Sequence, residues 1–203
     1  MLEVSKIDQT RKVVAAAICA TFFAYSPLGY SNDDIWATLK QGGNVIVLRH
    51  ATTEKLNDNA LTLKVGDCSV QRNLSEQGKK EALAIGQAFR THDIPVDEVL
   101  SSRYCRTQDT AMLAFNKVTS WQPLDLLHAV SDQAKETRTE TVTKRVTSYK
   151  GSKNIVIVSH RPNIAALTFE IVKSAEFLVL KPDHSGDYEI VGRLTVKAPL
   201  HNQ

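Results

Sequence analysis

Apolar positions in this chain form short β-branched runs that alternate with stretches of helical periodicity. Two of these runs are near copies of each other, Asn44-Val-Ile-Val-Leu-Arg-His50 and Asn154-Ile-Val-Ile-Val-Ser-His160. Continuous apolar runs of this length are typical of strands that are buried on both faces, as in parallel sheets. The pattern therefore predicts two core strands, each followed directly by a histidine.

Strands and helices are predicted to alternate along most of the chain. The predicted strands cover residues 44–49, 96–100, 155–159, 177–180 and 188–196. The predicted helices cover residues 34–40, 75–92, 106–115 and 132–149, and one more begins near Pro162. Asn32 and Asp33 are expected to cap the first helix, and the polar residues 51–73 to form a long loop over the first strand end.

This order of elements predicts an α/β fold, in which a mostly parallel sheet is the middle layer of an α/β/α sandwich. The last two strands flank the turn-forming residues 183–187, which predicts a C-terminal antiparallel hairpin. In open parallel sheets the ligand crevice lies beyond the carboxyl ends of the strands. We therefore expect His50 and His160 to face one another across a single crevice.

The N-terminal segment has the pattern of a secretory signal peptide. Cationic residues precede an apolar stretch at 13–28, and small residues follow it. The chain is therefore expected to divide into a signal peptide at 1–31 and one domain at 32–203, with a periplasmic or secreted location and no stable membrane span after cleavage. Glu3 and Asp8 are untypical of such leaders, which leaves an uncleaved anchor as the alternative.

Composition and charge narrow the range of partners. The chain has 203 residues, of which 42% are hydrophobic, and this is enough for one globular core. The net charge is only +3 and no basic run is present, so a nucleic-acid partner is not expected. The six histidines show no metal-binding spacing with cysteine or carboxylate, so neither a metal nor another cofactor is expected.

Two of the three cysteines belong to the predicted domain. Cys19 lies in the leader, which leaves Cys68 and Cys105. An even pair in an exported domain suggests a disulfide. Two separate thiols are the alternative, and the sequence does not decide between them.

Three segments at predicted strand ends bring cations and imidazoles together. They are Arg49-His50, the segment 101–107 that contains Arg106, and Ser159-His160. Guanidinium groups bind phosphate in bidentate fashion. An imidazole among cations stays neutral and is therefore a competent nucleophile, because neighbouring positive charge lowers its pKa. The combination indicates a pocket for a phosphoryl group.

These residues resemble the signature of the histidine phosphatase superfamily, the phosphoglycerate-mutase-like fold (branch 1). The matching motifs are Leu48-Arg49-His50-Ala51, Ser101-Ser102 with Arg106-Thr107 and Thr110-Ala111, and Ser159-His160. The resemblance covers about residues 40–195, although Arg-His-Ala replaces the family's Arg-His-Gly. Further similarity to small exported bacterial members lies in Asp67-Cys68, Gln71-Arg72-Asn73-Leu74-Ser75, Gly78, and the segments 177–182 and 191–194.

The resemblance implies a role for each pocket residue. His50 matches the histidine that attacks phosphorus and becomes phosphohistidine. Arg49 and Arg106 match the phosphate-binding arginines. His160 matches the second pocket histidine, which is catalytic and contacts the transferring phosphoryl group. Arg72 either touches the substrate or pairs with Asp67.

The proton donor for the leaving oxygen is not evident in the sequence. The family usually places a Glu or Asp between the Arg-Thr motif and the last parallel strand. Asp132 is the preferred candidate in this chain, and Glu136 and Glu54 are the others.

The function that follows is an exported phosphomonoester hydrolase of the histidine acid phosphatase type, acting on a small phosphorylated substrate through phosphohistidine. A phosphoryl-transfer mutase is one alternative, although the short segment 120–150 offers little of the insertion that closes a mutase over its substrate. A non-catalytic protein that binds a phosphorylated ligand is the other. The sequence predicts neither the substrate nor the oligomeric state.

Overall fold

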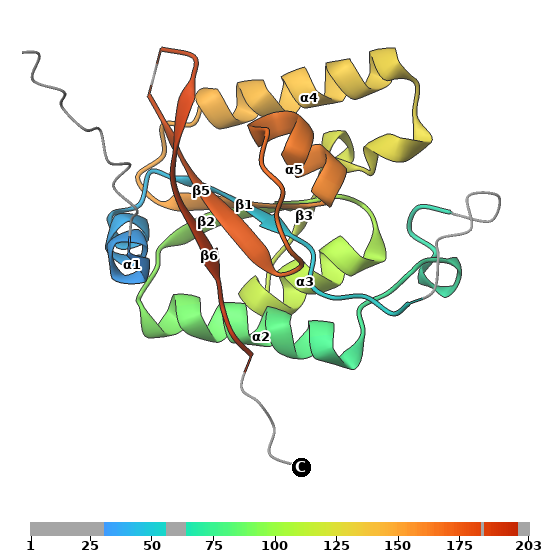
Figure 1. Cartoon of the computed structure of the whole chain (residues 1–203), viewed down its shortest axis with the longest axis horizontal. Coiled ribbons are helices and arrows are strands. Elements are labelled where there is room, and N and C mark those ends of the chain that lie inside the picture. The colour runs from blue at the N-terminus through green and yellow to red at the C-terminus, as the bar shows by residue number, and fades with distance from the viewer. Residues whose placement is uncertain (1–30, 56–63, 184, 199–203) are drawn as a thin grey trace, which may run out of the picture.

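A computed structural model describes residues 31–55, 64–183 and 185–198 (Figure 1). The predicted signal peptide and Cys19 therefore lie outside the described residues, except for Ser31, and so does the middle of the predicted loop at 51–73. The helices are α1 (Asn32–Gln41), α2 (Glu76–Thr91), α3 (Cys105–Phe115), α4 (Asp132–Thr147) and α5 (Arg161–Thr168). The strands are β1 (Val45–Arg49), β2 (Val96–Ser101), β3 (Thr119–Ser120), β4 (Asn154–Ser159), β5 (Glu176–Pro182) and β6 (Tyr188–Thr195). Short 3-10 helices are η1 (Cys68–Val70), η2 (Gln122–Leu124) and η3 (Leu127–Ala129).

The strands form one six-stranded sheet in the order β3-β2-β4-β1-β5-β6. β1 runs parallel to β4, and β4 and β3 run parallel to β2, whereas β5 runs antiparallel to both β1 and β6. The mostly parallel sheet and the C-terminal hairpin are therefore confirmed. The antiparallel pairing of β5 with β1 was not predicted from the sequence.

The two faces of the sheet are covered by different helices. Alternate residues of a strand point to opposite faces, so Ile46 and Leu48 pack in one apolar cluster and Val45 and Val47 in another. The first cluster includes buried residues of α1, α2 and α3, and the second includes buried residues of α4 and α5. Figure 1 shows these two helical layers on either side of the sheet. The three-layer α/β/α architecture is confirmed.

The start and end of α1 have local causes in the sequence. Its N-cap is Ser31, not Asn32 or Asp33 as predicted, because Ser31 and Asp34 form a reciprocal capping box. Gly42 ends the helix with a φ of 76°, a conformation that favours glycine. A Cβ atom at Gly42 would lie 2.1 Å from the carbonyl oxygen of Ser152, so a larger residue does not fit there.

The short strand β3 and the 3-10 helices η2 and η3 were also missed by sequence reasoning. They lie between α3 and α4, where the sequence has no sustained apolar period. Within the ranges that the structure describes, no helix combines the length and the apolar character needed to cross a bilayer.

Candidate active site

β1 and β4 bring the two predicted histidines to the same edge of the sheet. Arg49 pairs with Ser159 at the last register position of the two strands. His50 follows directly, and its backbone N–H donates to the carbonyl oxygen of Ser159 at 3.0 Å. His160 follows Ser159 and precedes α5. The two imidazole rings are 5.6 Å apart between centroids, so the structure places the two histidines next to one another, as predicted.

The ring of His50 has a defined tautomer. It is 3% exposed, and its Nδ1 atom lies 2.8 Å from the carbonyl oxygen of Ala51. A carbonyl oxygen can only accept a hydrogen bond, so Nδ1 of the neutral ring carries the proton. The Nε2 atom therefore keeps its lone pair, which is what a nucleophile needs.

The backbone that follows His50 is held by α2 and α3. The N–H of Ala51 donates to Oγ1 of Thr110 at 3.1 Å, and the N–H of Thr52 donates to the carboxylate of Glu81 at 2.9 Å. Gly78 approaches so closely that a Cβ atom there would lie 1.9 Å from the Thr52 carbonyl oxygen. The motif positions Thr110 and Gly78 thus support the loop that orients His50, and Glu81 is a supporting residue that sequence reasoning missed.

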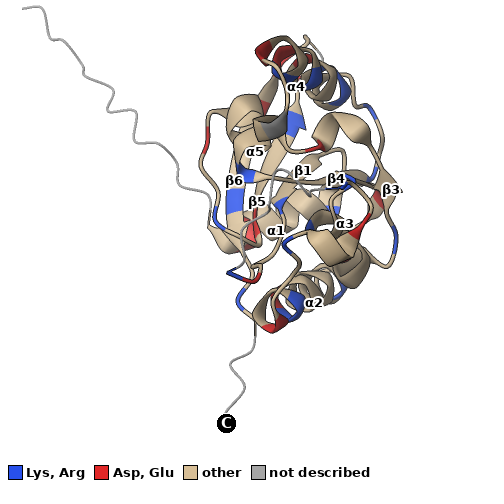
Figure 2. Cartoon of the chain, turned by 90° about the vertical axis from the view of Figure 1, so that its right-hand side faces the viewer, with Lys and Arg blue, Asp and Glu red and all other residues tan. Residues whose placement is uncertain are grey.

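Arginines from three segments interact electrostatically with both histidines. Arg106, in the first turn of α3, is 1% exposed, and its guanidinium carbon lies 4.9 Å from the centre of the Tyr104 ring. Arg49 donates from Nη1 to the carbonyl oxygen of Val172 at 2.9 Å. The third, Arg72, belongs to the segment before α2. Figure 2 views the chain from the side toward which β1 points and shows basic positions around β1, β4 and α3.

Burial and positive charge keep both imidazoles neutral. The pKa of His50 is lowered to about 3, first by burial and then by the charges of Arg106, Arg49 and Arg72. The pKa of His160 also falls well below its ordinary value, mainly because the ring is buried, with smaller effects from the same arginines and from His50. Two neutral imidazoles beside three guanidinium groups form a site that is suited to an oxyanion such as phosphate.

A further cation, Arg161, was missed by sequence reasoning. Its charge contributes to lowering the pKa of Arg49, although burial of Arg49 is the larger cause. Arg161 is exposed and is the first residue of α5. Its position directly after the His160 motif was the signal available in the sequence.

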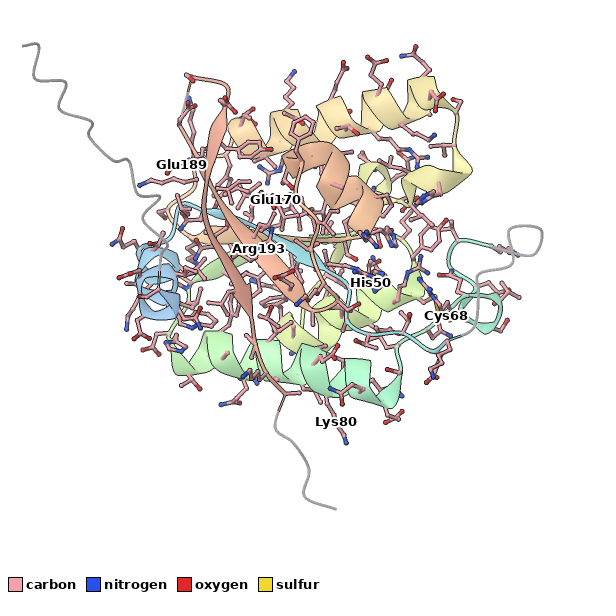
Figure 3. The ribbon with its side chains drawn as sticks, viewed as in Figure 1. His50, Cys68, Lys80, Glu170, Glu189 and Arg193 are labelled. Atoms are coloured by element: carbon pink, nitrogen blue, oxygen red, sulfur yellow. A yellow bond between two sulfur atoms is a disulfide. The ribbon has the colours of Figure 1, made fainter. Side chains whose placement is uncertain are left out.

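The loop before α2 is covalently attached to the start of α3. Cys68 and Cys105 form a disulfide, with a Cα–Cα distance of 5.7 Å. The side chain of Gln71 strengthens the attachment, because its Oε1 accepts from the N–H of Cys105 at 3.0 Å. Of the two alternatives that the sequence left open, the structure contains the disulfide. Figure 3 shows Cys68 in the loop beside the region of His50.

Two roles were predicted for Arg72, namely contact with the substrate and pairing with Asp67. Oδ1 of Asp67 accepts from the N–H and the hydroxyl of Ser69, which makes Asp67 the N-cap of η1. The charge of Arg72 contributes to lowering the pKa of both His50 and His160. This electrostatic effect favours the alternative in which Arg72 lies at the pocket.

In the described parts of the chain, none of the three candidate proton donors forms a hydrogen bond or an ion pair with His50 or His160. Asp132 lies in the first turn of α4 with its side chain 96% exposed, and it pairs with Lys135 at 2.7 Å. That hydrogen bond lowers the pKa of Asp132, which is the opposite of what a general acid requires. Glu136 and Glu54 are exposed as well. The first-turn position of Asp132 is that of a carboxylate that stabilises a helix N-terminus.

Sequence reasoning also missed a buried carboxylate near His160. The Nε2 atom of His160 lies 2.9 Å from Oγ of Ser102, and that hydroxyl lies 3.2 Å from Oδ1 of Asp125. Asp125 is 3% exposed and also binds Arg103. No residue pattern around Asp125 marks it as part of a site, because it reaches the pocket from the irregular segment between η2 and η3.

No cluster of three or more metal-binding side chains occurs within the described parts of the chain. The charges that act on both His50 and His160 are those of Arg49, Arg72 and Arg106, and the nearby carboxylate of Asp125 is paired with Arg103, so the site is suited to binding an anion.

Comparison with known proteins agrees with this geometry. Residues 45–131 match the family model of the histidine phosphatase superfamily (branch 1). The matched segment includes Arg49, His50 and Arg106. No curated protein sequence matches the chain.

Several solved structures share the fold. A protein from Escherichia coli assigned as an alpha-ribazole-5'-P phosphatase has a TM-score of 0.61 and 16% identity, over 77% of this chain and 99% of that chain. The alpha-ribazole phosphatase from Shigella flexneri has a TM-score of 0.56 and 18% identity, over 79% and 99%. The protein histidine phosphatase SixA complexed with tungstate has a TM-score of 0.52 and 14% identity, over 75% and 96%. The sequence match over residues 45–131 and the shared fold make this chain similar to the histidine phosphatase superfamily, branch 1.

Proposed function

We propose that this protein is a phosphomonoester hydrolase that works through a phosphohistidine at His50. The observation that carries the proposal is the contact between Nδ1 of His50 and the carbonyl oxygen of Ala51, which leaves Nε2 unprotonated. This nitrogen belongs to a buried ring whose neutral form is favoured by burial and by neighbouring arginines. A buried, neutral and oriented imidazole among guanidinium groups is equipped to attack a bound phosphoryl group.

The arginines and His50 have separate roles in this reaction. The guanidinium groups of Arg49 and Arg106 bind the equatorial oxygens, where charge is concentrated in the transition state. The lone pair of His50 Nε2 forms a bond to phosphorus while the bond from phosphorus to the leaving oxygen breaks. Water then attacks the phosphohistidine, the phosphorus–nitrogen bond breaks, and inorganic phosphate leaves.

A substrate screen with the purified protein tests this function. The screen covers sugar phosphates, lipopolysaccharide-core phosphates, alpha-ribazole phosphate and a phosphohistidine-containing protein, the last two because of the names of the structural neighbours. We expect release of inorganic phosphate from at least one small phosphomonoester. Binding without hydrolysis would favour the non-catalytic alternative, and transfer to a second hydroxyl group of an acceptor would favour the mutase.

We also propose that the protein acts outside the cytoplasm. The basic and apolar pattern of the first thirty-one residues supports export. The bond between Cys68 and Cys105 is compatible with it, because disulfides persist in oxidising compartments. N-terminal sequencing of the protein from its host, with cell fractionation, should find a mature chain that begins near Asn32 in the periplasmic or secreted fraction. Met1 on soluble cytoplasmic protein would contradict export, and Met1 on membrane-bound protein would indicate the anchor.

A further inference from the structure

His160, Ser102 and Asp125 form a continuous chain of buried hydrogen bonds. Their exposed fractions are 1%, 0% and 3%. Nε2 of His160 lies 2.9 Å from Oγ of Ser102, and Oγ of Ser102 lies 3.2 Å from Oδ1 of Asp125. These three residues come from the end of β4, the segment after β2 and the segment after η2, so the chain joins three separate parts of the fold.

The direction of each hydrogen bond follows from the chemistry of its partners. The carboxylate of Asp125 only accepts, so the hydroxyl of Ser102 donates to it. The N–H of Tyr104 also donates to Oγ of Ser102, at 3.3 Å. The oxygen of Ser102 then has one lone pair left, which accepts from an N–H at Nε2 of His160. His160 is therefore the Nε2–H tautomer, opposite to His50, which carries its proton on Nδ1.

This tautomer leaves Nδ1 as the unprotonated nitrogen of His160. The atom is buried, and no hydrogen-bond partner for it occurs among the described residues. A buried polar atom without a partner is costly, and in native proteins it commonly marks a functional position. Because the His50 ring is 5.6 Å away, a phosphoryl group on Nε2 of His50 would lie beside the His160 ring.

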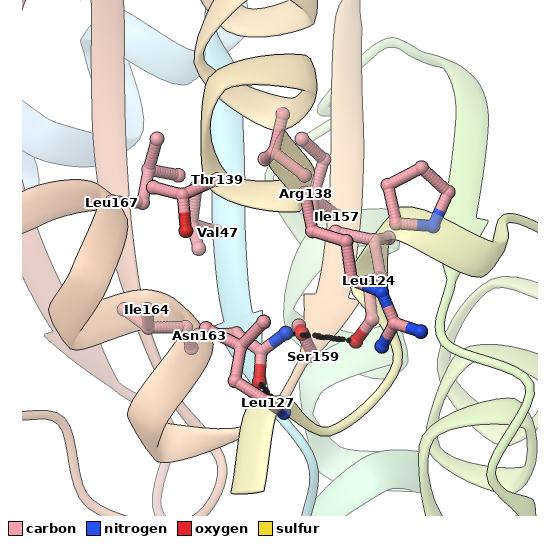
Figure 4. A pocket seen from close by; sticks show the side chains of 12 residues that line it. Val47, Leu124, Leu127, Arg138, Thr139, Ile157, Ser159, Asn163, Ile164 and Leu167 are labelled. Atoms are coloured by element: carbon pink, nitrogen blue, oxygen red, sulfur yellow. Dashed lines mark hydrogen bonds between the residues drawn. The ribbon is translucent and has the colours of Figure 1, made fainter. Parts of the chain in front are cut away.

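Asp125 is held firmly enough to orient the other two residues. Its carboxylate accepts from Nε and Nη2 of Arg103 at 2.8 and 2.6 Å, in addition to Ser102. Its carbonyl oxygen accepts from Nδ2 of Asn163 at 2.9 Å. The preceding residue, Leu124, is bound through its carbonyl oxygen by Ser159 at 2.9 Å and by Asn163 at 3.2 Å. Figure 4 shows Ser159, Asn163 and Leu124 together at the edge of the small cavity between the sheet, α4 and α5.

We infer that Ser102 and Asp125 are positioning residues that hold His160 as the Nε2–H tautomer, so that its Nδ1 carries the proton between the phosphoryl group and the leaving oxygen. The proton-carrying part rests on the proposed hydrolase function. Within the described ranges, neither Asp132 nor the two exposed glutamates forms a hydrogen bond with His50 or His160. We therefore assign the proton transfer to His160.

The proton and the electrons balance over the two steps. A phosphomonoester monoanion gives its proton to Nδ1 of His160. As Nε2 of His50 bonds to phosphorus and the ester bond breaks, Nδ1 passes that proton to the leaving oxygen, which departs as the alcohol. In the second step a water molecule attacks phosphorus and gives a proton to Nδ1. The phosphorus–nitrogen bond breaks with its electron pair returning to His50, and the proton returns to the departing phosphate.

The groups around His160 allow Nδ1 to gain and lose a proton. Electrostatic interactions with four groups contribute to lowering the pKa of His160. These groups are Arg106 in α3, Arg49 and His50 at the end of β1, and Arg72 in the segment before α2. Burial of the ring favours its neutral form most, and these positive charges add to that effect when the site is empty. A bound phosphate offsets them, because a nearby anion favours the charged form of a histidine.

The test compares Ser102→Ala with a matched control, Ser101→Ala. Ser101 is equally buried, but its hydroxyl donates to the carbonyl oxygen of Ser102 at 2.9 Å and is not part of the chain to His160. Each protein is assayed with an alkyl phosphate, whose leaving oxygen needs a proton, and with p-nitrophenyl phosphate, whose leaving oxygen does not. We expect Ser102→Ala to lower kcat/KM for the alkyl phosphate by roughly 100-fold and for the aryl phosphate by less than about tenfold. Ser101→Ala should stay close to the wild type with both.

Equal losses with the two substrates would overturn the inference, because damage to the fold or to phosphate binding does not depend on the leaving group. Melting temperatures establish that each variant folds. If Ser102→Ala does not fold, Asp125→Asn is used in its place, because an amide NH2 group replaces one of the two carboxylate oxygens, Oδ1 facing Ser102 or Oδ2 facing the Arg103 side chain, and cannot accept a hydrogen bond there.

The tautomer is measured separately from activity. The ¹⁵N chemical shifts of the His160 ring in the phosphate-free protein at neutral pH should indicate Nε2–H in the wild type and a mixture of tautomers in Ser102→Ala. A wild-type ring with its proton on Nδ1 would overturn the inference even if the enzyme is an active phosphatase. If the wild type hydrolyses no phosphomonoester, the proposed function and the proton transfer both fail, while the ¹⁵N shifts still decide whether Ser102 positions His160.

Discussion

Nδ1 of His50 donates to the carbonyl oxygen of Ala51 over 2.8 Å, and this contact leaves the opposite ring nitrogen, Nε2, unprotonated. Ala51 is itself fixed, since its N–H donates to Thr110 in α3. The contact uses the backbone of the next residue, so the side chain at position 51 is not required for it. This explains how alanine can replace the glycine found in the related motif.

The low pKa of His50 predicts that the folded protein loses stability as the pH falls below about 6.5. In the unfolded chain the imidazole binds a proton near its ordinary pKa of 6.5, whereas in the folded protein it does so only near 3. The unfolded state therefore binds more protons between these values, and the free energy of unfolding rises with pH across that window. Between pH 7 and pH 5 this one group lowers the free energy of unfolding by about 2 kcal/mol.

Urea unfolding of the wild type and of His50→Ala at the two pH values, in phosphate-free buffer, measures this contribution. The wild type should lose more stability than the variant on going from pH 7 to pH 5. An equal or larger loss in the variant would show that His50 has an ordinary pKa in the folded protein.

Replacing Arg106 by lysine should impair phosphate binding without unfolding the protein. Lysine keeps the charge but not the fork of donors that holds two oxygens at once. We expect kcat/KM to fall by at least about tenfold, the effect of losing one hydrogen bond to a charged group. Arg145→Lys is the matched control, because Arg145 forms an ion pair with Glu98 rather than acting on the histidine pair. Similar losses in both variants would argue against a phosphate-binding role for Arg106.

The disulfide should stabilise the fold and hold the loop beside α3. The bond spans 37 residues, for which loop entropy predicts stabilisation of roughly 3–4 kcal/mol before any strain is subtracted. A reductant should therefore lower the melting temperature of the wild type. It should have no effect on the double variant Cys68→Ser/Cys105→Ser. Titration that finds Cys68 and Cys105 both free in protein from the host would contradict the bond.

Asp132→Asn should leave turnover within about twofold of the wild type, as expected for the substitution of an exposed side chain that lies outside the core and outside the hydrogen-bond network of the two histidines. The side chain is 96% exposed and paired with Lys135, and this hydrogen bond lowers its pKa, which does not favour protonation of a leaving group. Steady-state kinetics with an alkyl phosphate checks this. A loss of 100-fold or more would restore Asp132 as the general acid.

The sequence predicted the fold and the proximity of His50, His160 and Arg106 because both depend on local patterns. The runs that end at His50 and His160 are short and uniformly apolar, and such strands pair in parallel with their ends at one edge. The position of Arg106 followed from its place at the start of a helix after β2. In each case the deciding residues lie within a few positions of one another.

The remaining features depend on contacts between distant segments. Asp125 comes from an irregular stretch with no periodicity, and it reaches His160 only through Ser102. Glu81 and Arg161 are ordinary charged helix residues by sequence. The preference for Asp132 failed to anticipate its pairing with Lys135, because a carboxylate at a helix start has the same local pattern whether it is catalytic or exposed.

Direct detection of the phosphoenzyme tests the central claim that His50 is the nucleophile. The protein is mixed with a ³²P-labelled substrate found in the screen, quenched in alkali within the first turnovers, and digested for peptide mapping. We predict acid-labile, alkali-stable label on the peptide that contains His50, and none on the His50→Ala variant, which should also be inactive. Turnover by His50→Ala at the wild-type rate, or label on another residue, would contradict the mechanism.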